Sequence, residues 1–317
     1  MDHGKYTTIL APDMLDYIDA CSTVSDPAMT KPSITQMRAR YSALCKAFSY
    51  PYPAGLATED KLIESLERQI ACRHYHPEPA ATSRPLILFF HGGGFILGDI
   101  DSHDSICADL AMGTGLDVLA TDYALAPEHP FPAALDDGMA VVAAVMAAEP
   151  ERGFILCGDS AGGWLAASIA HRLRALNDGR AELCLRGQVL IYPALGGDRQ
   201  LPSYHEHAHA PLLSAAEIDW YYSQFFAHET LPPYLGPLDD DNFSNLPETI
   251  CFAAACDPLH DDSMAYTRLI TEAGGRARCY SEEGLIHGYL RARFTVKAAA
   301  ESFERIVAAC RFLATPG

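Results

Sequence analysis

The chain has 317 residues, of which 49% are hydrophobic and 20% are charged, a composition that excludes a disordered or fibrous protein. Its 41 acidic and 23 basic residues give a net charge of −18, which disfavours nucleic acid and anionic membrane surfaces as partners. No secretory signal is visible in the first residues, and the longest apolar stretch, residues 139–148, is too short to span a bilayer. Ten cysteines without a CxxC pair indicate free thiols, so we expect a cytoplasmic protein.

The first fifty or so residues are predicted to be helical. Met37, Tyr41, Leu44 and Phe48 recur at spacings of three and four, which is the pattern of one helix face. The sequence PYPAG at residues 51–55 then ends the pattern, because its prolines and glycine break a helix.

From there the chain alternates between short apolar strands and helices. Strands are predicted at residues 70–76, 86–91, 117–122, 154–158, 187–192, 249–256 and 276–280. Helices are predicted at residues 103–112, 133–148, 161–177, 262–273 and 295–313. This alternation, with several continuous apolar strands, predicts an α/β domain with a mostly parallel central sheet and helices on both faces.

One segment interrupts the alternation. Between residues 196 and 237 there is no strand candidate, but residues 214–227 form a helical pattern with prolines on both sides. We expect a single domain over residues 1–317, with a helical cap built by residues 1–50 or so and by residues 196–237.

A nucleophile motif lies at the first strand–helix junction after residue 150. The sequence GDSAG at residues 158–162 follows an apolar strand and precedes an Ala-rich helix, which is the setting that a G-x-S-x-G nucleophile turn requires. The sharp turn presents the Ser160 hydroxyl above the sheet, and the glycines permit close approach of neighbouring backbone. Ser160 is therefore the predicted nucleophile.

A glycine-rich segment upstream supports this prediction. The sequence HGGGF at residues 91–95 ends the strand 86–91. A flexible loop is the alternative interpretation of three glycines, but a hydrolase that attacks a carbonyl needs free backbone N–H groups to stabilise the oxyanion. We predict that the amides of Gly93, Gly94 and Ala161 form this oxyanion hole, with a smaller contribution from the positive end of the helix at Ala161.

The base and its orienting acid should follow the serine, in the order acid and then histidine. Asp257 comes directly after the strand 249–256, and His287 lies in a loop after the last strand, so these two complete the predicted triad. His260 is too close to Asp257 and is expected to begin the next helix. Competing residues are the histidines His171 and His228 and the acids Glu282 and Glu283.

These motifs together resemble the bacterial hormone-sensitive-lipase-like esterases, the group that includes acetyl esterases. The match comprises residues 91–98 with His103 and Asp104, YALAPEHPFPA at 123–133, GDSAGG at 158–163, DPL at 257–259 and HGY at 287–289. The segments run in the family order over roughly residues 85–290. The resemblance implies a capped α/β-hydrolase fold, no metal or cofactor, short acyl esters as substrates and a homodimer through an edge strand.

This sequence departs from the family pattern at two positions. Trp164 stands where the family usually has a small or polar residue, and it either narrows the acyl pocket or packs the helix against the sheet, the second being our preferred interpretation. Ala124 stands where the family has an arginine, so a structural ion pair is expected to be missing.

Three further features received a structural interpretation. His205, His207 and His209 alternate in sequence, as metal ligands on one face of a strand would. Because prolines bound this segment and no strand is predicted there, we interpret it as a solvated loop of the cap. Glu128 is expected to be a buried structural partner, and Asp159 is expected to hydrogen-bond neighbouring loops.

The motifs predict a serine carboxylesterase that acts through Ser160, His287 and Asp257. The resemblance implies that its substrates are acetyl to hexanoyl esters of small molecules. An amidase or formamidase could use the same triad. A lyase and a non-catalytic ligand-binding receptor are weaker alternatives on this fold, and a receptor is disfavoured because His287 is present.

Overall fold

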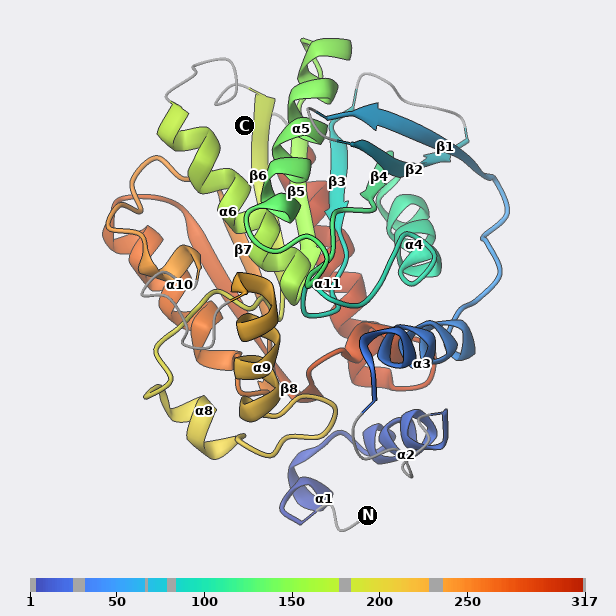
Figure 1. Cartoon of the computed structure of the whole chain (residues 1–317), viewed down its shortest axis with the longest axis vertical. Coiled ribbons are helices and arrows are strands. Elements are labelled where there is room, and N and C mark those ends of the chain that lie inside the picture. The colour runs from blue at the N-terminus through green and yellow to red at the C-terminus, as the bar shows by residue number, and fades with distance from the viewer. Residues whose placement is uncertain are drawn as a thin grey trace.

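The computed structural model describes residues 4–24, 32–65, 68–78, 84–176, 184–227 and 236–315. Within these ranges the sheet has eight strands in the order β1-β2-β4-β3-β5-β6-β7-β8 (Figure 1). The strands are β1 (Leu56–Glu64), β2 (Gln69–Pro77), β3 (Leu86–Phe90), β4 (Val118–Thr121), β5 (Phe154–Asp159), β6 (Leu185–Ile191), β7 (Thr249–Cys256) and β8 (Ala277–Ile286). β2 pairs antiparallel with β1 and β4, and every other pair is parallel, so the prediction of a mostly parallel sheet is confirmed.

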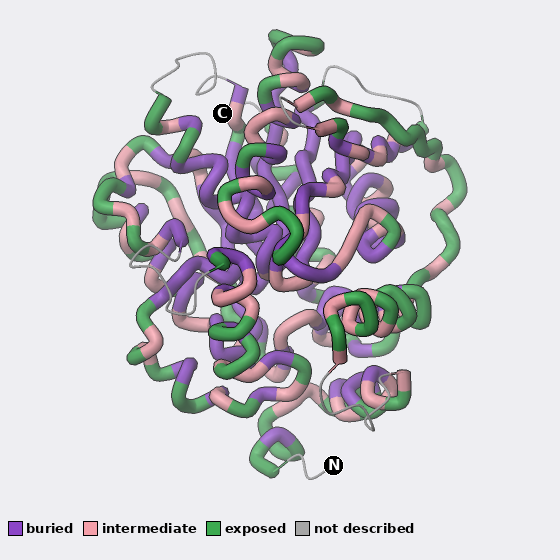
Figure 2. The backbone as a smooth tube through the Cα atoms, in the orientation of Figure 1, coloured by how far each residue is buried: buried purple, intermediate pink, exposed green. Residues whose placement is uncertain are grey.

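Helices cover both faces of the sheet. The long ones are α4 (Asp104–Thr114), α5 (Ala133–Ala148), α6 (Ala161–Leu176), α10 (His260–Glu272) and α11 (Lys297–Ala314). Alternate residues of β3 face opposite sides: Leu88 and Phe90 pack in the cluster of α5, α6 and α10, whereas Ile87 and Phe89 pack in the cluster of α4 and α11. The buried residues accordingly concentrate in the centre of the molecule (Figure 2).

The remaining helices gather at the end of the sheet where the parallel strands have their carboxyl ends (Figure 1). They are α1 (Tyr6–Ile9), α2 (Met14–Val24), α3 (Ile34–Ala47), α8 (Pro202–Glu206) and α9 (Ala215–Phe226), and two short 3₁₀ segments are η1 (Pro237–Asp239) and η2 (Tyr289–Ala292). Ser33 and Ser214 begin α3 and α9 with capping boxes, which satisfy amides that a helix start leaves unpaired. Ligands of open α/β sheets generally bind at this end.

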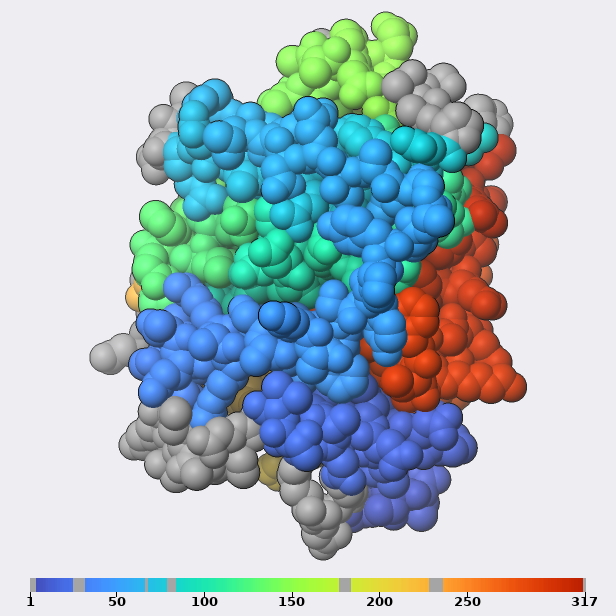
Figure 3. All heavy atoms as spheres, turned by 90° about the vertical axis from the view of Figure 1, so that its right-hand side faces the viewer, coloured from blue at the N-terminus to red at the C-terminus, as the bar shows by residue number. Residues whose placement is uncertain are grey.

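The N-terminal helices are attached by side chains and by a backbone hydrogen bond, without strand pairing. The Ala11 amide donates to the Gly284 carbonyl of β8 at 2.9 Å. The Tyr17 hydroxyl donates a hydrogen bond to the Gly288 carbonyl at 3.4 Å, and the ring centroids of Tyr50 and Phe294 lie 4.1 Å apart. Viewed from the side, the N-terminal segment lies directly against the C-terminal part of the chain (Figure 3). The first fifty residues and the segment that follows β8 thus meet beside the carboxyl ends of the strands.

Sequence patterns located most of the longer elements but missed strand β1 and the short helix α8. Helix α5 has the predicted bounds, and α10 begins at His260 as expected. Strand β1 was not predicted, because its sequence LATEDKLIE is almost fully exposed at the edge of the sheet and lacks a buried apolar face. Strand β8 extends to Ile286, six residues beyond its predicted end, so His287 follows the strand directly.

Two predictions from composition can be checked. No helix among the described residues is long and apolar enough to cross a membrane. All ten cysteines are free, and nine of them are buried, with Cys279 half-buried. The prediction of buried free thiols is confirmed.

Candidate active site

Ser160 lies in the turn between β5, which ends at Asp159, and α6, which begins at Ala161. Its φ of 54° is in the left-handed region, a strained conformation for a serine that is typical of functional turns. A Cβ at Gly162 would overlap the carbonyl oxygen of Phe90, and one at Gly158 would overlap the backbone of Gly162. The two glycines are therefore required for the close contact of this turn with β3.

The structure brings Ser160, His287 and Asp257 into one hydrogen-bonded chain. His287 Nε2 lies 2.8 Å from Ser160 Oγ, and His287 Nδ1 lies 2.6 Å from Asp257 Oδ2. Asp257 follows β7 and is fully buried, and its other carboxylate oxygen accepts a hydrogen bond from the Leu259 amide at 2.9 Å. The acid and the histidine come from the ends of neighbouring parallel strands, which explains how residues 30 positions apart meet.

The competing residues have other partners. Glu282 forms an ion pair with Arg305, and Glu283 is exposed. His171 contacts Asp240 at 2.8 Å and the Tyr266 hydroxyl at 3.0 Å, on α6 away from the turn. His260 Nδ1 lies 2.8 Å from Asp261 Oδ1. His228 lies outside the described residues.

The amides proposed for the oxyanion hole border the same space as Ser160. Gly93 and Gly94 have φ values of 132° and 60°, which glycine adopts without strain, and a Cβ at Gly94 would overlap the ring of Tyr221. In the part of the chain that the structure describes, the amides of Gly93, Gly94 and Ala161 donate to no backbone carbonyl. Backbone amides that have no backbone partner and lie in the same cavity as a serine hydroxyl are of the kind that an oxyanion hole uses.

A cavity of about 260 Å³ lies above Ser160 and His287. One side, which we term the insertion wall, comes from the segment 196–237 and consists of Leu212, Leu213, Ile218, Tyr221 and Tyr222. Another side, which we term the arginine wall, consists of Tyr17, Tyr41, His103 and Arg291. Both segments proposed to form a cap thus contribute side chains to the lining.

Comparisons with known proteins agree with this geometry. The model of the alpha/beta hydrolase fold family matches residues 87–291. The chain is 36% identical to an esterase of Mycobacterium tuberculosis, LipI, over 272 residues that cover 82% of this chain and 83% of the relative. It is 32% identical to an ethyl acetate hydrolase of Pseudomonas putida over 274 residues, covering 81% and 84% of the two chains.

Solved structures give the same result. An esterase from Pyrobaculum calidifontis superposes with a TM-score of 0.84 at 28% identity, covering 97% of this chain and 99% of that one. The thermostable carboxylesterase EstE1 superposes with a TM-score of 0.81 at 30% identity, covering 90% and 99%.

The chain belongs to the α/β-hydrolase family. Within it, the chain is a member of the hormone-sensitive-lipase-like esterases and is a carboxylic ester hydrolase, as the resemblance implied.

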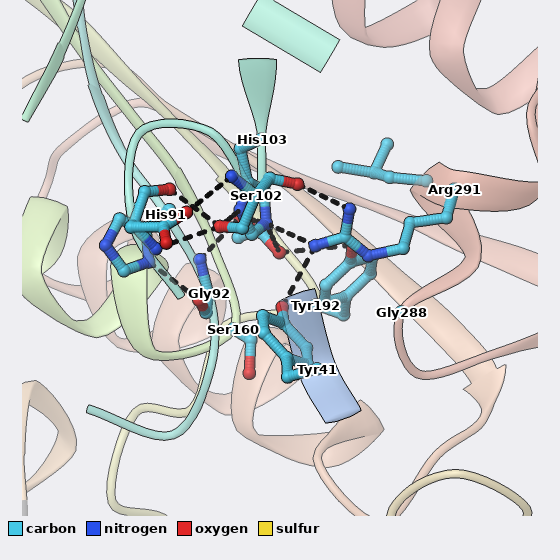
Figure 4. Close-up of polar contacts among 12 residues, drawn as sticks. Tyr41, His91, Gly92, Ser102, His103, Ser160, Tyr192, Gly288 and Arg291 are labelled. Carbon is cyan, nitrogen blue, oxygen red and sulfur yellow. Dashed lines mark hydrogen bonds and ion pairs between the residues drawn. The ribbon is translucent and has the colours of Figure 1, made fainter. Parts of the chain in front are cut away.

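Next to Ser160 of this hydrolase lies a buried polar network that includes His103 and Arg291 (Figure 4), and Asp159 is part of it. The Gly92 amide donates to Asp159 Oδ1 at 2.8 Å, while His103 Nε2 and the Tyr192 hydroxyl lie 3.3 Å from Oδ2. Burial alone would raise the pKa of Asp159, but His103, Arg291 and the Gly92 amide outweigh it and lower the pKa to about 2. Asp159 is therefore an anion that holds the glycine loop against the turn, which confirms its predicted role.

The histidines of this network are held neutral. Burial is the main cause, and it lowers the pKa of His91 to about 3, with a further contribution from His103. Burial also lowers the pKa of His103. The rings of His91 and His103 stack at 5.6 Å, so a charge on either would face the other without water to screen it.

Trp164 of the esterase packs and does not line the cavity. It is fully buried, and its ring lies 5.5 Å from Phe95, 6.1 Å from Phe131 and 5.3 Å from Phe225 in edge-on geometry. The preferred interpretation as a packing residue is right, and the aromatic partners of the ring lie on α9 and on two loops. Trp164 therefore fixes the helix that carries the insertion wall.

The position of Ala124 is held by its backbone. The Ala124 amide donates to Asp137 Oδ2 at 2.8 Å, and Arg68 Nη2 lies 3.2 Å from the same oxygen. Arg68, just before β2, therefore forms an ion pair with the carboxylate that the Ala124 amide contacts.

The prediction for Glu128 is half wrong. Its side chain is 53% exposed rather than buried, yet it is a structural partner, because it forms an ion pair with Arg38 of α3. The same guanidinium donates to the carbonyls of Ile96 and Ala126, at 2.8 and 3.0 Å. This contact attaches α3 to the loop that follows the glycine segment.

The three alternating histidines do not converge. His205 is in the short helix α8 and is exposed, as is His209, whereas His207 is buried and lies 3.3 Å from the Tyr6 hydroxyl. Among the described residues, the ligand atoms that could share a metal ion belong to Glu59, His74 and His76 on the β1–β2 ribbon. Lys61 Nζ already contacts Glu59 at 3.1 Å and His74 at 3.2 Å, and this group does not line the cavity.

Proposed function

We propose that this carboxylesterase is a serine enzyme acting on short acyl esters, acetyl to hexanoyl, through an acyl-enzyme intermediate. The observation that carries the proposal is the hydrogen-bonded chain Ser160–His287–Asp257 at the floor of the cavity. The cavity volume of about 260 Å³ lies below the range usual for drug-sized ligands, which supports small substrates.

In the first step, His287 Nε2 takes the hydroxyl proton of Ser160 while Oγ attacks the ester carbonyl carbon. The carbonyl oxygen becomes an oxyanion that accepts hydrogen bonds from the amides of Gly93, Gly94 and Ala161. Collapse breaks the bond to the alcohol oxygen, which leaves with the proton from His287. Asp257 keeps Nδ1 protonated, so that Nε2 is the free acceptor.

In the second step, water enters the site of the departed alcohol. His287 takes a proton from this water, whose oxygen attacks the acyl carbon, and the carboxylic acid leaves as Ser160 recovers its proton. Ester and amide substrates differ only in the leaving group, so matched p-nitrophenyl acetate and p-nitroacetanilide compare the esterase with an amidase.

The test is hydrolysis of p-nitrophenyl esters from acetate to dodecanoate by the native protein and by Ser160→Ala. We expect turnover concentrated at acetate to hexanoate, and a loss in kcat of about 10⁴-fold or more in the variant, as for other triad nucleophiles. Ser168→Ala is the matched control, because Ser168 is a buried serine on the same helix whose hydroxyl has no partner among the described residues. Near-native activity of the Ser160 variant contradicts the proposal.

We further propose that the enzyme is a cytoplasmic homodimer. Ten free cysteines support a reducing compartment, and β8, an edge strand, supports pairing between copies. Light scattering on the purified protein measures the mass directly, and a monomer at micromolar concentration refutes the dimer.

A further inference from the structure

Arg291 differs from the other buried arginines of the described chain. Arg152, Arg291 and Arg293 are each no more than 7% exposed. Arg152 Nη2 lies 2.8 Å from Asp117, and Arg293 Nη2 lies 2.5 Å from Asp109. No carboxylate of a described residue lies within 4.0 Å of the Arg291 guanidinium. A buried charge without a directly paired counter-charge is costly, so this one requires an explanation.

The contacts of Arg291 are with neutral groups (Figure 4). Its Nη1 donates to the Ser102 carbonyl at 2.7 Å, and its Nη2 donates to the Tyr41 hydroxyl at 3.0 Å and lies 3.3 Å from His103 Nε2. The nearest acid in the network, Asp159, contacts the same His103 Nε2 atom as Arg291 does, and Gly92 and Tyr192 already donate to it. The guanidinium is thus oriented but not neutralised by contact.

The side chain also lines the cavity that contains Ser160. A planar guanidinium with several fixed N–H donors fits the two oxygens of a carboxylate, since the two groups can form parallel charge-assisted hydrogen bonds. The overall charge of −18 repels anions at long range, but salt screens that repulsion within about 10 Å. Contact with Arg291 in a site shielded from water is much stronger.

We propose that Arg291 binds a carboxylate of the substrate, so that the natural ester carries an apolar acyl chain on one side and a carboxylate on the other. This inference rests on the proposed esterase function and names its substrate class. The acyl chain contacts the insertion wall, where Leu212, Leu213 and Ile218 provide apolar surface. The alcohol part then extends towards the arginine wall and places its carboxylate on Arg291.

The test uses two matched pairs of alkyl esters, followed by titration of the released acid. On the alcohol side, 4-acetoxybutanoate is compared with 4-methylpentyl acetate, in which an isopropyl group replaces the carboxylate. On the acyl side, monoethyl glutarate is compared with ethyl 5-methylhexanoate in the same way. We expect the native enzyme to have a higher kcat/KM for the charged member of the first pair than for the neutral one. If only the second pair shows such a preference, the carboxylate site is still supported, but the acyl part then lies along the arginine wall and the alcohol part along the insertion wall.

Arg291→Met should reduce kcat/KM for the charged ester by about 10- to 100-fold, the range that corresponds to a charge-assisted hydrogen bond. The neutral ester should lose much less kcat/KM than the charged ester, because Met keeps most of the apolar volume. Arg291→Lys should retain part of the preference. Arg293→Met is the matched control: it removes an equally buried arginine from the same segment, and its effect should be the same for both members of a pair.

Two results overturn the inference. One is a native enzyme that prefers neither charged ester; the other is an Arg291→Met protein that loses activity equally on charged and neutral members. If Arg291→Met does not fold, three measurements still test the carboxylate site. They are the ester preferences of the native enzyme, those of the Arg291→Lys variant, and competitive inhibition of ethyl hexanoate hydrolysis by glutarate. Failure of the esterase proposal itself is separate, because it would appear as absent turnover of the neutral esters.

Discussion

The insertion wall and the arginine wall face the same serine but differ in chemistry and in support. The insertion wall carries three aliphatic residues and two tyrosines, and it is held from behind by Phe225 and Trp164. The arginine wall carries hydroxyls, an imidazole and a guanidinium, held by hydrogen bonds to Ser102 and Asp159. One wall is thus fixed by packing and the other by a polar network. The comparison shows why a substrate with two different ends would suit this cavity.

The largest effect should come from removing the support of the insertion wall. Trp164→Ala should reduce the free energy of unfolding by about 3–5 kcal/mol, because a fully buried indole leaves a large void. Urea unfolding followed by circular dichroism measures this. The other tryptophan, Trp220, is 36% exposed on α9, and Trp220→Ala is the control, with an expected change within about 0.5 kcal/mol. Equal effects of the two variants would show that Trp164 is not the support we describe.

A smaller effect should follow from opening the insertion wall itself. Tyr221 lines the cavity and packs against Gly94, so Tyr221→Ala should give longer acyl chains space. The ratio of kcat/KM for octanoate to that for hexanoate should rise by about 10- to 15-fold, since two more methylenes become buried at ~0.8 kcal/mol each. Leu44→Ala changes the cavity on the side of α3 and should leave the ratio unchanged. A rise in that variant instead would place the acyl chain along α3.

The smallest effect should be a pH dependence of stability that belongs to the polar network. His91 has a pKa of about 3 in the folded protein against 6.5 as a free side chain. The unfolded chain therefore binds a proton between these values while the folded protein does not, so stability decreases as the pH falls from about 6.5 to 3. In His91→Gln the loss between pH 6 and pH 5 should be smaller by about 1 kcal/mol.

Urea unfolding at both pH values measures this difference, with His205→Gln as an exposed control. An identical slope in native protein and in His91→Gln would mean that His91 is not kept neutral by the fold.

The sequence predicted what local patterns encode. Continuous apolar strands and the motifs around Ser160 and Gly93 are local signals, so the sheet and the nucleophile turn could be placed before the structure was known. Asp257 and His287 followed from strand ends, because parallel strands present their carboxyl ends together.

What the sequence did not predict depends on long-range contacts or weak patterns. Strand β1 has no apolar alternation, so only its pairing with β2 defines it. Arg68 reaches Asp137 from a distant element, and Arg291 lies just outside the matched segments, the last of which ends at Tyr289. The exposure of Glu128 depends on the position of Arg38, which is 90 residues away.

The attachment of the N-terminal helices has an evolutionary consequence. Tyr17, Arg38 and Tyr41 connect α2 and α3 to the rest of the molecule through side chains, and the Ala11 amide donates to the Gly284 carbonyl of β8. No strand of the described sheet passes through this segment. Mutations there can remodel one side of the cavity without changing any strand register or the nucleophile turn. The segment is therefore an exchangeable module, and chimeras that carry it from related esterases are a direct route to enzymes with the same catalytic centre and a different substrate range.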